Sequence, residues 1–229
     1  MTISNQNAKR FLGAFAAARV SNGMRLGIGS GSTVAAFIDA LGERIREFGL
    51  EVVCVAASVE SERHARAQGL KVESLDTIPE VDLAVDGADA VSPDRVLIKG
   101  GGAALVRERL VIASAGSTLI LVGDDKPTGP FYHVTVPIAV VPFGWAYVRD
   151  RVRRLTDHVE LRRQESLPVV TDDGLYLLDA HFDEVRDPIG LHQALKLTEG
   201  VVDTGIFAGY QPEVWISDGV AVWPLRRAG

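Results

Sequence analysis

The chain has 229 residues, 47% of them hydrophobic and 24% charged, which is enough for a substantial core and excludes a disordered protein. Its formal net charge of −6 argues against a nucleic-acid partner, because phosphate contacts need a dense basic surface. With one cysteine, no apolar run near the roughly 20 residues that cross a bilayer and a polar start, we expect no disulfide, no membrane partner and a cytoplasmic location.

The first half of the chain alternates between helical and strand patterns. Apolar residues at helical spacing predict a helix over 6–20, and a short strand then leads into a glycine-rich segment that is followed by a helix from Ser32 to Phe48. Further strands are expected at 52–56, 82–86, 95–98 and 118–122, with helices near 60–68 and 103–113. This alternation predicts an α/β fold with a Rossmann-like, doubly wound and mostly parallel sheet.

The pattern changes after residues 126–130. We expect a strand at 134–141, a helix near 144–155, a hairpin of strands at 167–171 and 174–179, and a helix near 188–197. Two short apolar runs, 214–216 and 220–223, should return to the first sheet. The predicted domains are therefore a Rossmann-like catalytic domain of residues 1–130 plus 207–229 and a smaller α+β domain of residues 131–206, which acts as a lid or an interface.

The first candidate site is the glycine-rich segment 27–33, at a junction between a strand and a helix. Its glycines allow the backbone to approach a ligand closely, and the free N–H groups of the following helix favour an anion. Ser30, Ser32 and Thr33 add hydroxyl donors. The spacing fits neither a Walker loop nor the usual dinucleotide motif. The alternative interpretation is a plain turn with Ser32 as a helix cap.

Two further segments carry charged side chains where apolar runs end. Asp86 and Asp89 flank Gly87 and could bind sugar hydroxyls or transfer protons, although a simple Asp-Gly turn is also possible and a metal site is disfavoured. Lys99 precedes three glycines and a helix that carries Glu108. A lysine and glycine N–H groups can stabilise an oxyanion while Glu108 acts as a general base, unless Glu108 is an ordinary exposed helix residue.

These segments together resemble a known family, the type A ribose-5-phosphate isomerases. Residues 27–33 are similar to its G-x-G-T/S-G-S-T segment, residues 86–89 to its D-G-A-D segment and residues 99–108 to its K-G-G-G-x-A-L-x-R-E segment. Lys126 stands where the family has the lysine of a D-x-S-K segment, and Lys9 lies on the first helix, where a basic residue is common. The resemblance covers essentially the whole chain.

The resemblance implies that D-ribose 5-phosphate and D-ribulose 5-phosphate interconvert through an enediolate, without a metal or organic cofactor. Glu108 is then the base, Lys99 stabilises the enediolate oxygen, and Asp86 and Asp89 bind hydroxyls and assist ring opening. The expected substrate-binding residues are Ser30, Gly31, Ser32, Thr33, Gly87, Ala88, Gly100, Gly101 and Gly102, with Lys126 and Lys9 at the phosphate. The family also implies a homodimer or a homotetramer.

Two departures from the family pattern keep other functions open. Ala90 replaces the glutamate that commonly follows D-G-A-D, and the D-x-S-K segment reads Gly123-Asp124-Asp125-Lys126, where Asp125 could weaken phosphate binding. An isomerase of a related sugar phosphate, for example one with four carbons, is therefore an alternative. A non-catalytic sugar-phosphate sensor and a relative of the coenzyme A transferases are the others, although a sensor has no need for Glu108 together with Lys99.

Overall fold

The structure, a computed structural model, describes residues 3–156 and 158–226. The chain divides into two compact units, each with its own hydrophobic core. The first unit comprises Met1–Ala88, Arg107–Pro127 and Tyr210–Gly229, and the second comprises Asp89–Val106 and Thr128–Gly209. Residues 89–106, 128–130 and 207–209, which the sequence analysis grouped with the first domain, belong to the second unit in this division.

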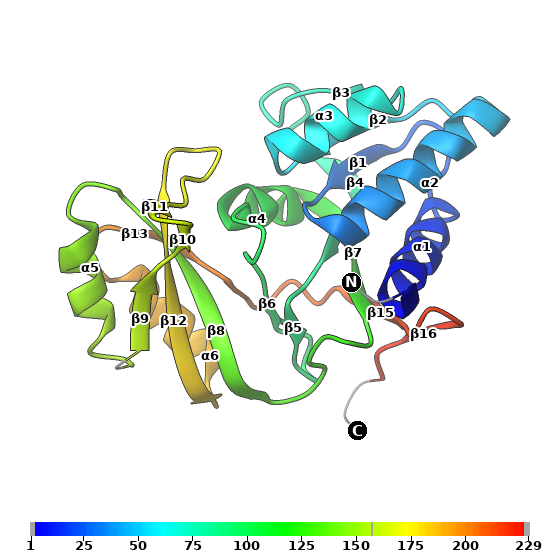
Figure 1. Ribbon diagram of the computed structural model, residues 1–229. Helices are drawn as coiled ribbons and strands as arrows, with labels where there is room; N and C mark the ends of the chain where they lie inside the picture. Colours follow the sequence, from blue (N-terminus) through cyan, green and yellow to red (C-terminus); the bar gives the residue numbers. More distant parts are fainter. Residues whose placement is uncertain (1–2, 157, 227–229) are drawn as a thin grey trace. The chain divides into compact units, whose positions relative to one another are not determined.

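The first unit is built on a seven-stranded sheet of order β16-β15-β7-β4-β1-β2-β3 (Figure 1). Its strands are β1 (Arg25–Ile28), β2 (Val53–Ala56), β3 (Lys71–Val72), β4 (Val81–Gly87), β7 (Ala115–Gly123), β15 (Glu213–Ser217) and β16 (Val222–Pro224). All neighbouring pairs are parallel except β15 with β16, which confirms the predicted mostly parallel sheet and the return of the C-terminal strands. The chain winds outward from β1 to β3 and then continues on the other side of β1 with β4. The switch point of the sheet, where ligands bind in such folds, lies between β1 and β4.

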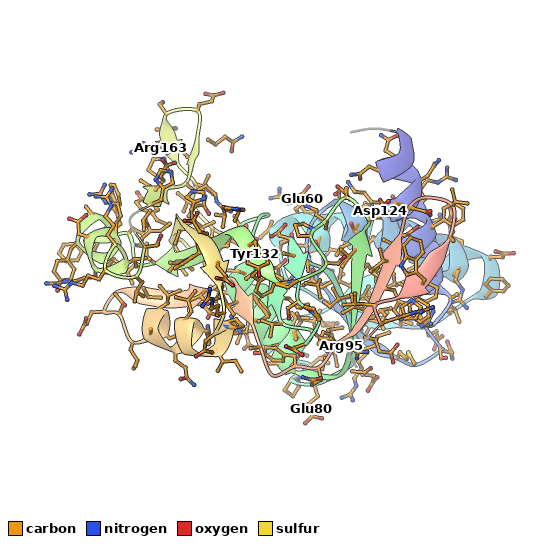
Figure 2. The ribbon with its side chains drawn as sticks, turned by 90° about the horizontal axis from the view of Figure 1, so that it is seen from below. Glu60, Glu80, Arg95, Asp124, Tyr132 and Arg163 are labelled. Carbon is orange, nitrogen blue, oxygen red and sulfur yellow. The ribbon has the colours of Figure 1, made fainter. Side chains whose placement is uncertain are left out.

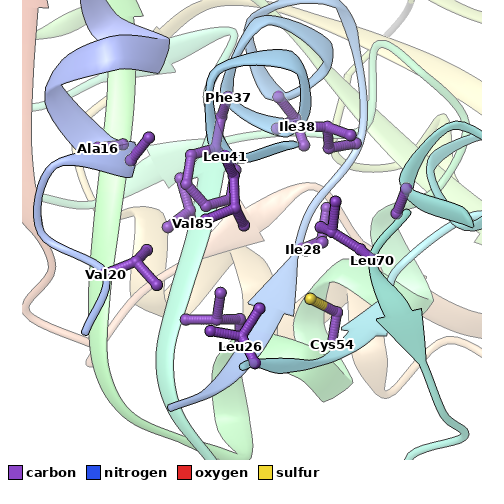
Figure 3. Packing of buried hydrophobic residues seen from close by; sticks show 14 of the residues in the cluster. Ala16, Val20, Leu26, Ile28, Phe37, Ile38, Leu41, Cys54, Leu70 and Val85 are labelled. Atoms are coloured by element: carbon purple, nitrogen blue, oxygen red, sulfur yellow. The ribbon is translucent and has the colours of Figure 1, made fainter. Parts of the chain in front are cut away.

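Helices cover both faces of this sheet. They are α1 (Ile3–Ala17), α2 (Ser32–Phe48), α3 (Val59–Ala67) and α4 (Leu105–Ala113). Because successive strand residues point to opposite faces, Leu26 and Ile28 enter the core beneath α1 and α2, as Figure 3 shows, while Gly27 faces the other way. The side chain of Val111 on α4 lies where a Cβ of Gly27 would be. The sheet is therefore doubly wound, as predicted.

The lone cysteine belongs to this core. Cys54 is fully buried beside Leu26 and Ile28 (Figure 3), and burial raises the pKa of its thiol to about 12. A thiol with such a pKa is protonated and unreactive at neutral pH. Cys54 is thus a packing residue.

The second unit contains a four-stranded antiparallel sheet of order β13-β8-β12-β9. Its strands are β8 (Phe131–Val140), β9 (His158–Leu161), β12 (Tyr176–Val185) and β13 (Val201–Thr204), and its helices are α5 (Trp145–Val152) and α6 (Pro188–Lys196). Side chains from both helices join those of the strands in one core that includes Val152, Leu178 and Leu195. This is the predicted smaller α+β unit.

Two smaller sheets complete the second unit. One joins β5 (Ala90–Val91), β6 (Leu97–Ile98) and β14 (Ile206–Phe207), and the other joins β10 (Arg163–Gln164) and β11 (Leu167–Pro168). The strand predicted at 95–98 is β6, which pairs antiparallel with β5 and β14 rather than with the parallel sheet. Both of its residues are buried, so its apolar pattern did not reveal which sheet it joins.

The predicted hairpin at 167–179 is only partly correct. Its turn is present, since Gly174 has a φ of 75° and its N–H donates to the carbonyl of Thr171 at 2.9 Å. The N–H of Thr171 donates to the carbonyl of Leu175 at 2.9 Å, and the N–H of Leu175 donates to Oγ1 of Thr171 at 3.1 Å. The first arm, however, contributes only an isolated bridge to this hairpin, Val170 with Tyr176, whereas β12 makes its main pairing with β8 and β9.

In the described part of the chain, no helix is long and apolar enough to cross a membrane.

Candidate active site

The first glycine segment joins β1 to α2 at the switch point of the parallel sheet. A Cβ on Gly29 would collide with the carboxyl group of Asp86, so this position must be glycine for the loop to lie against β4. Gly31 is required for a different reason, because its φ of 95° and ψ of 177° are essentially restricted to glycine. Gly31 is also the N-cap residue of α2 and has no side chain to accept a hydrogen bond from Ser32, Thr33 or the next residue. Ser32, the helix cap in the alternative interpretation, is instead the first residue of α2.

Asp86 lies at the carboxyl end of β4 and is 1% exposed. Its Oδ1 atom accepts hydrogen bonds from the N–H of Gly87 at 2.7 Å and from the N–H of Ser30 at 3.3 Å. The structure thus brings the first two sequence motifs together, although they are far apart in the chain. Hydrogen bonds from two backbone N–H groups restrict the orientation of this buried carboxylate.

A serine cluster that the sequence analysis missed supports the same loop. Ser30 Oγ lies 3.2 Å from Ser58 Oγ, and Ser61 Oγ donates to the carbonyl of Gly29 at 2.8 Å. Ser58 also caps α3 by accepting a hydrogen bond from the N–H of Ser61. The signal was a Ser-x-x-Ser pattern directly after the strand at 53–56, which places hydroxyl groups at the same edge of the sheet.

Glu108 lies in the first turn of α4 and is 4% exposed. It is three residues before Val111, so both side chains share one face of the helix, and Val111 packs against Gly27 of β1. Glu108 therefore belongs to the sheet-facing side of α4, and the alternative of an exposed helix glutamate is wrong. A carboxylate in such surroundings is the usual form of a catalytic acid or base.

The loop after β7 carries Lys126, which is exposed. Its neighbour Asp125 accepts a hydrogen bond from the side-chain amide of Asn5 on α1, with Asn5 Nδ2 and Asp125 Oδ2 2.8 Å apart. Lys9 follows Asn5 by four residues and so shares its face of α1. The structure thereby places the helix face of Lys9 next to the loop of Lys126, within the first unit.

The second unit holds Asp89, Lys99 and the glycines that follow Lys99. Asp89 Oδ2 accepts a hydrogen bond from the N–H of Gly101 at 2.8 Å, and a Cβ on Gly101 would crowd the same carboxylate. Lys99 is 2% exposed, its N–H donates to the carbonyl of Gly205, and its Nζ lies 5.7 Å from the ring centroid of Phe207. Gly100 has a φ of 102°, which explains the need for glycine there.

Comparisons with known proteins show which family the chain resembles. The family model described as ribose 5-phosphate isomerase A (phosphoriboisomerase A) matches residues 53–219. A ribose-5-phosphate isomerase A from Bartonella bacilliformis is 41% identical over 210 residues, which cover 89% of this chain and 90% of that protein. One from Methanosarcina acetivorans is 40% identical over 208 residues, which cover 90% of this chain and 88% of that protein.

The chain belongs to the ribose 5-phosphate isomerase A family.

Solved structures of ribose 5-phosphate isomerases share the fold. The enzyme from Methanocaldococcus jannaschii superimposes with a TM-score of 0.88 at 31% identity, covering 97% of this chain and 99% of that one. A D-ribose-5-phosphate isomerase in complex with phospho-erythronic acid gives a TM-score of 0.92 at 32% identity, covering 99% and 100%. The predicted family, fold class and isomerase activity are confirmed.

The structure shows the surroundings of the two departures from the isomerase pattern, Ala90 and the segment 123–126. Ala90 is 4% exposed, pairs with Ile98 and contributes to the second core. Asp125 Oδ1 lies where a Cβ of Gly123 would be, so the glycine gives the carboxylate the space to fold back over the loop. Among the described residues, no group of three or more histidine, cysteine, aspartate or glutamate side chains is arranged to hold a metal ion.

Proposed function

We propose that the chain interconverts D-ribose 5-phosphate and D-ribulose 5-phosphate by proton transfer through an enediolate, with Glu108 as the base. The single observation that carries this proposal is the burial of the Glu108 carboxylate on the sheet-facing side of α4, in a chain of this isomerase family. Burying a carboxylate costs free energy, and strongly perturbed carboxylates gather at active sites, so a buried glutamate in an isomerase of this family is a candidate for the proton-transfer chemistry.

The reaction moves protons without any net oxidation. Glu108 removes the proton from C2 of the open-chain aldose, and the electron pair of that bond forms the enediolate with negative charge on O1. The proton on Glu108 exchanges with solvent, and the base then delivers a proton to C1 while the O2 proton moves to O1, which leaves the carbonyl at C2. A positioned base of this kind contributes on the order of 10²–10⁴-fold to the rate.

Lys99 is proposed to stabilise the enediolate oxygen. Its ammonium group supplies the charge, and the N–H groups of Gly100, Gly101 and Gly102 supply further donors of the kind that stabilise developing oxyanions. The anchoring of its backbone to Gly205 and the burial of its side chain support this role, because both limit the positions that the ammonium can take.

Asp86 and Asp89 are proposed to bind sugar hydroxyls and to assist ring opening. Each carboxylate uses one oxygen to accept backbone N–H groups, those of Gly87 and Ser30 for Asp86 and that of Gly101 for Asp89. A carboxylate has two oxygens with several acceptor positions, which suits hydrogen bonds from sugar hydroxyls. Gly87 and Ala88, between them in the chain, are proposed to contact the substrate through their backbone.

The phosphate is proposed to bind at the first unit's loops. The N-terminus of α2, formed by Ser30, Gly31, Ser32 and Thr33, presents helix N–H groups that suit an anion. Lys126 and Lys9 are proposed to add positive charge. The relative in complex with phospho-erythronic acid supports a ligand of this class, since that molecule joins a phosphate to an acid whose two oxygens resemble those of an enediolate.

The test of the proposal is the variant Glu108→Gln, which removes the base and keeps the shape. Its kcat for D-ribose 5-phosphate should fall by about 10²–10⁴-fold, while the affinity for phospho-erythronic acid and the melting temperature stay close to those of the wild type. Glu62→Gln is the matched control, since Glu62 lies on the exposed side of α3 and pairs with Arg66. Turnover of Glu108→Gln within threefold of the control would refute the role of Glu108.

We further propose that the protein acts as a homodimer or homotetramer in the cytoplasm. Self-association is supported by large apolar side chains that are exposed on the second unit, such as Phe143 at 94% and Leu197 at 83%. Analytical ultracentrifugation would measure the mass of the assembly and so test this proposal.

A cytoplasmic location is supported by the charge of a sugar phosphate. A charged molecule does not cross a bilayer unaided, so the enzyme must be in the compartment where its substrate is made.

A further inference from the structure

Arg162, which the sequence analysis did not single out, reaches the loop that follows Lys99. Its Nη1 atom donates to the carbonyl of Gly100 at 2.7 Å and to the carbonyl of Gly101 at 3.2 Å. The other side of the guanidinium forms a two-point pair with Asp179, from Nε at 2.8 Å and from Nη2 at 2.5 Å. All of these residues belong to the second unit.

Arg162 and Asp89 contact the peptide between Gly100 and Gly101 from opposite sides. In a trans peptide the C=O of one residue and the N–H of the next point in opposite directions. Arg162 therefore holds the Gly100 carbonyl on one side, while the N–H of Gly101 on the other side donates to Asp89 at 2.8 Å. Asp179, Arg162, the peptide and Asp89 form one chain of charge-assisted contacts that ends on a residue of the proposed site.

Arg162 is itself held rigidly. Its N–H donates to the carbonyl of Leu177 at 2.8 Å, and its own carbonyl accepts from the N–H of Val169 at 3.0 Å. Asp179 lies within β12, paired with strands on both sides. The side chains of Arg162 and Asp179 are only 17% and 20% exposed, so their pair is better shielded from solvent than a surface ion pair. Because Arg162 is held by these contacts, its hydrogen bonds restrict the positions of the Gly100 and Gly101 carbonyls.

We propose that Arg162, oriented by Asp179, is a positioning residue for the isomerase reaction. It holds the Gly100–Gly101 peptide so that Asp89 keeps its orientation and Lys99, the residue before Gly100, keeps its place. This inference rests on the proposed function, because it assumes that Asp89 and Lys99 act on the sugar phosphate. A three-glycine loop would otherwise have many conformations, and Arg162 removes that freedom before substrate binds.

The experiment compares Arg162→Gln with the matched control Arg163→Gln. Arg163, labelled in Figure 2, is the next residue, lies on the β10–β11 hairpin and donates to the carbonyl of Ser166 in the same hairpin. Steady-state kinetics with D-ribose 5-phosphate give kcat and KM, and hydrogen exchange followed by NMR gives the protection of the Gly101 amide. Thermal melting shows whether each variant is folded.

In Arg162→Gln, kcat should fall by about 10- to 100-fold, because a displacement near 1 Å of a reacting group has an effect of this order. KM should change less than kcat, and the Gly101 amide should exchange at least about tenfold faster (an effect on the order of one charge-assisted hydrogen bond). Arg163→Gln should match the wild type in all three. If Arg162→Gln does not fold because Asp179 is left unpaired, the double variant Arg162→Gln/Asp179→Asn removes both charges and carries the same test.

Two other outcomes overturn the proposal. A kcat close to that of the wild type refutes positioning, whether or not the Gly101 amide is loosened. A lower kcat with unchanged exchange of Gly101 shows that Arg162 does not act through this peptide. A wild-type chain that fails to convert D-ribose 5-phosphate contradicts the proposed function instead, and the Gly101 amide then still decides whether Arg162 holds the loop.

Discussion

The close approach between Gly29 and Asp86 makes a specific prediction about stability. A Cβ at position 29 would overlap the carboxyl carbon and both carboxyl oxygens of Asp86, which are the nearest atoms to that point. The variant Gly29→Ala must therefore displace the Asp86 side chain or separate the loop from β4. Either change weakens the hydrogen bonds that Asp86 accepts from Gly87 and Ser30.

The magnitude follows from these contacts. Overpacking a buried position costs about 1–3 kcal/mol. Because the clash involves only the carboxyl group, the background Asp86→Ala, which retains only the Cβ, should tolerate Gly29→Ala at little cost. The two substitutions should therefore be non-additive, with a coupling free energy of about 1–3 kcal/mol.

Equilibrium urea unfolding of the wild type, both single variants and the double variant measures that coupling. Gly129→Ala is the control for a glycine-to-alanine change, since a Cβ there meets nothing within 4 Å, and it should leave the free energy of unfolding nearly unchanged. Additivity of Gly29→Ala and Asp86→Ala within about 0.5 kcal/mol would refute the argument that position 29 is glycine because the Asp86 carboxyl group lies against it.

Two further predictions concern other charged side chains of the first unit. The guanidinium and the N–H of Arg25 hold the pKa of Asp82 below its usual range, so the pair stabilises the fold above the ordinary carboxyl pKa and the benefit is lost as the pH falls. Asp82→Asn should thus lower the melting temperature at pH 7, and the difference should vanish near pH 2 (well below the ordinary carboxyl pKa of about 4); a difference that grows in acid would contradict this. Asp125→Ser should tighten the binding of phospho-erythronic acid by up to about fivefold, because it removes a negative charge next to Lys126, and calorimetry showing equal or weaker affinity would count against that effect.

The sequence predicted those features that depend on local patterns. Strand and helix periodicity located the parallel sheet and the glycine junctions, because β1, α2 and β4 carry their signals within short stretches. The common placement of Asp86 and the first glycine segment followed from the rule that parallel strands end at one edge, and the hydrogen bond between Ser30 and Asp86 agrees with it.

Features that depend on contacts between residues far apart in the chain could not be predicted from the sequence. β6 is a two-residue apolar strand that any buried environment would accept, so its antiparallel partners β5 and β14 could not be inferred. Arg162 lies in a stretch without a motif, and its contact with Gly100 spans 62 residues of sequence. The burial of Glu108 likewise depends on the sheet beneath α4, not on the residues beside it in the chain.

The most direct test of the account follows the substrate protons. The chain would be incubated with D-ribose 5-phosphate in deuterated water, and NMR would monitor ribulose 5-phosphate and the hydrogens on C1 and C2. An enediolate formed by Glu108 predicts rapid conversion with deuterium incorporated at C1 of the product, and a loss of both in Glu108→Gln. Conversion that carries the original hydrogen from C2 to C1 without any deuterium, or the absence of conversion, would contradict the account.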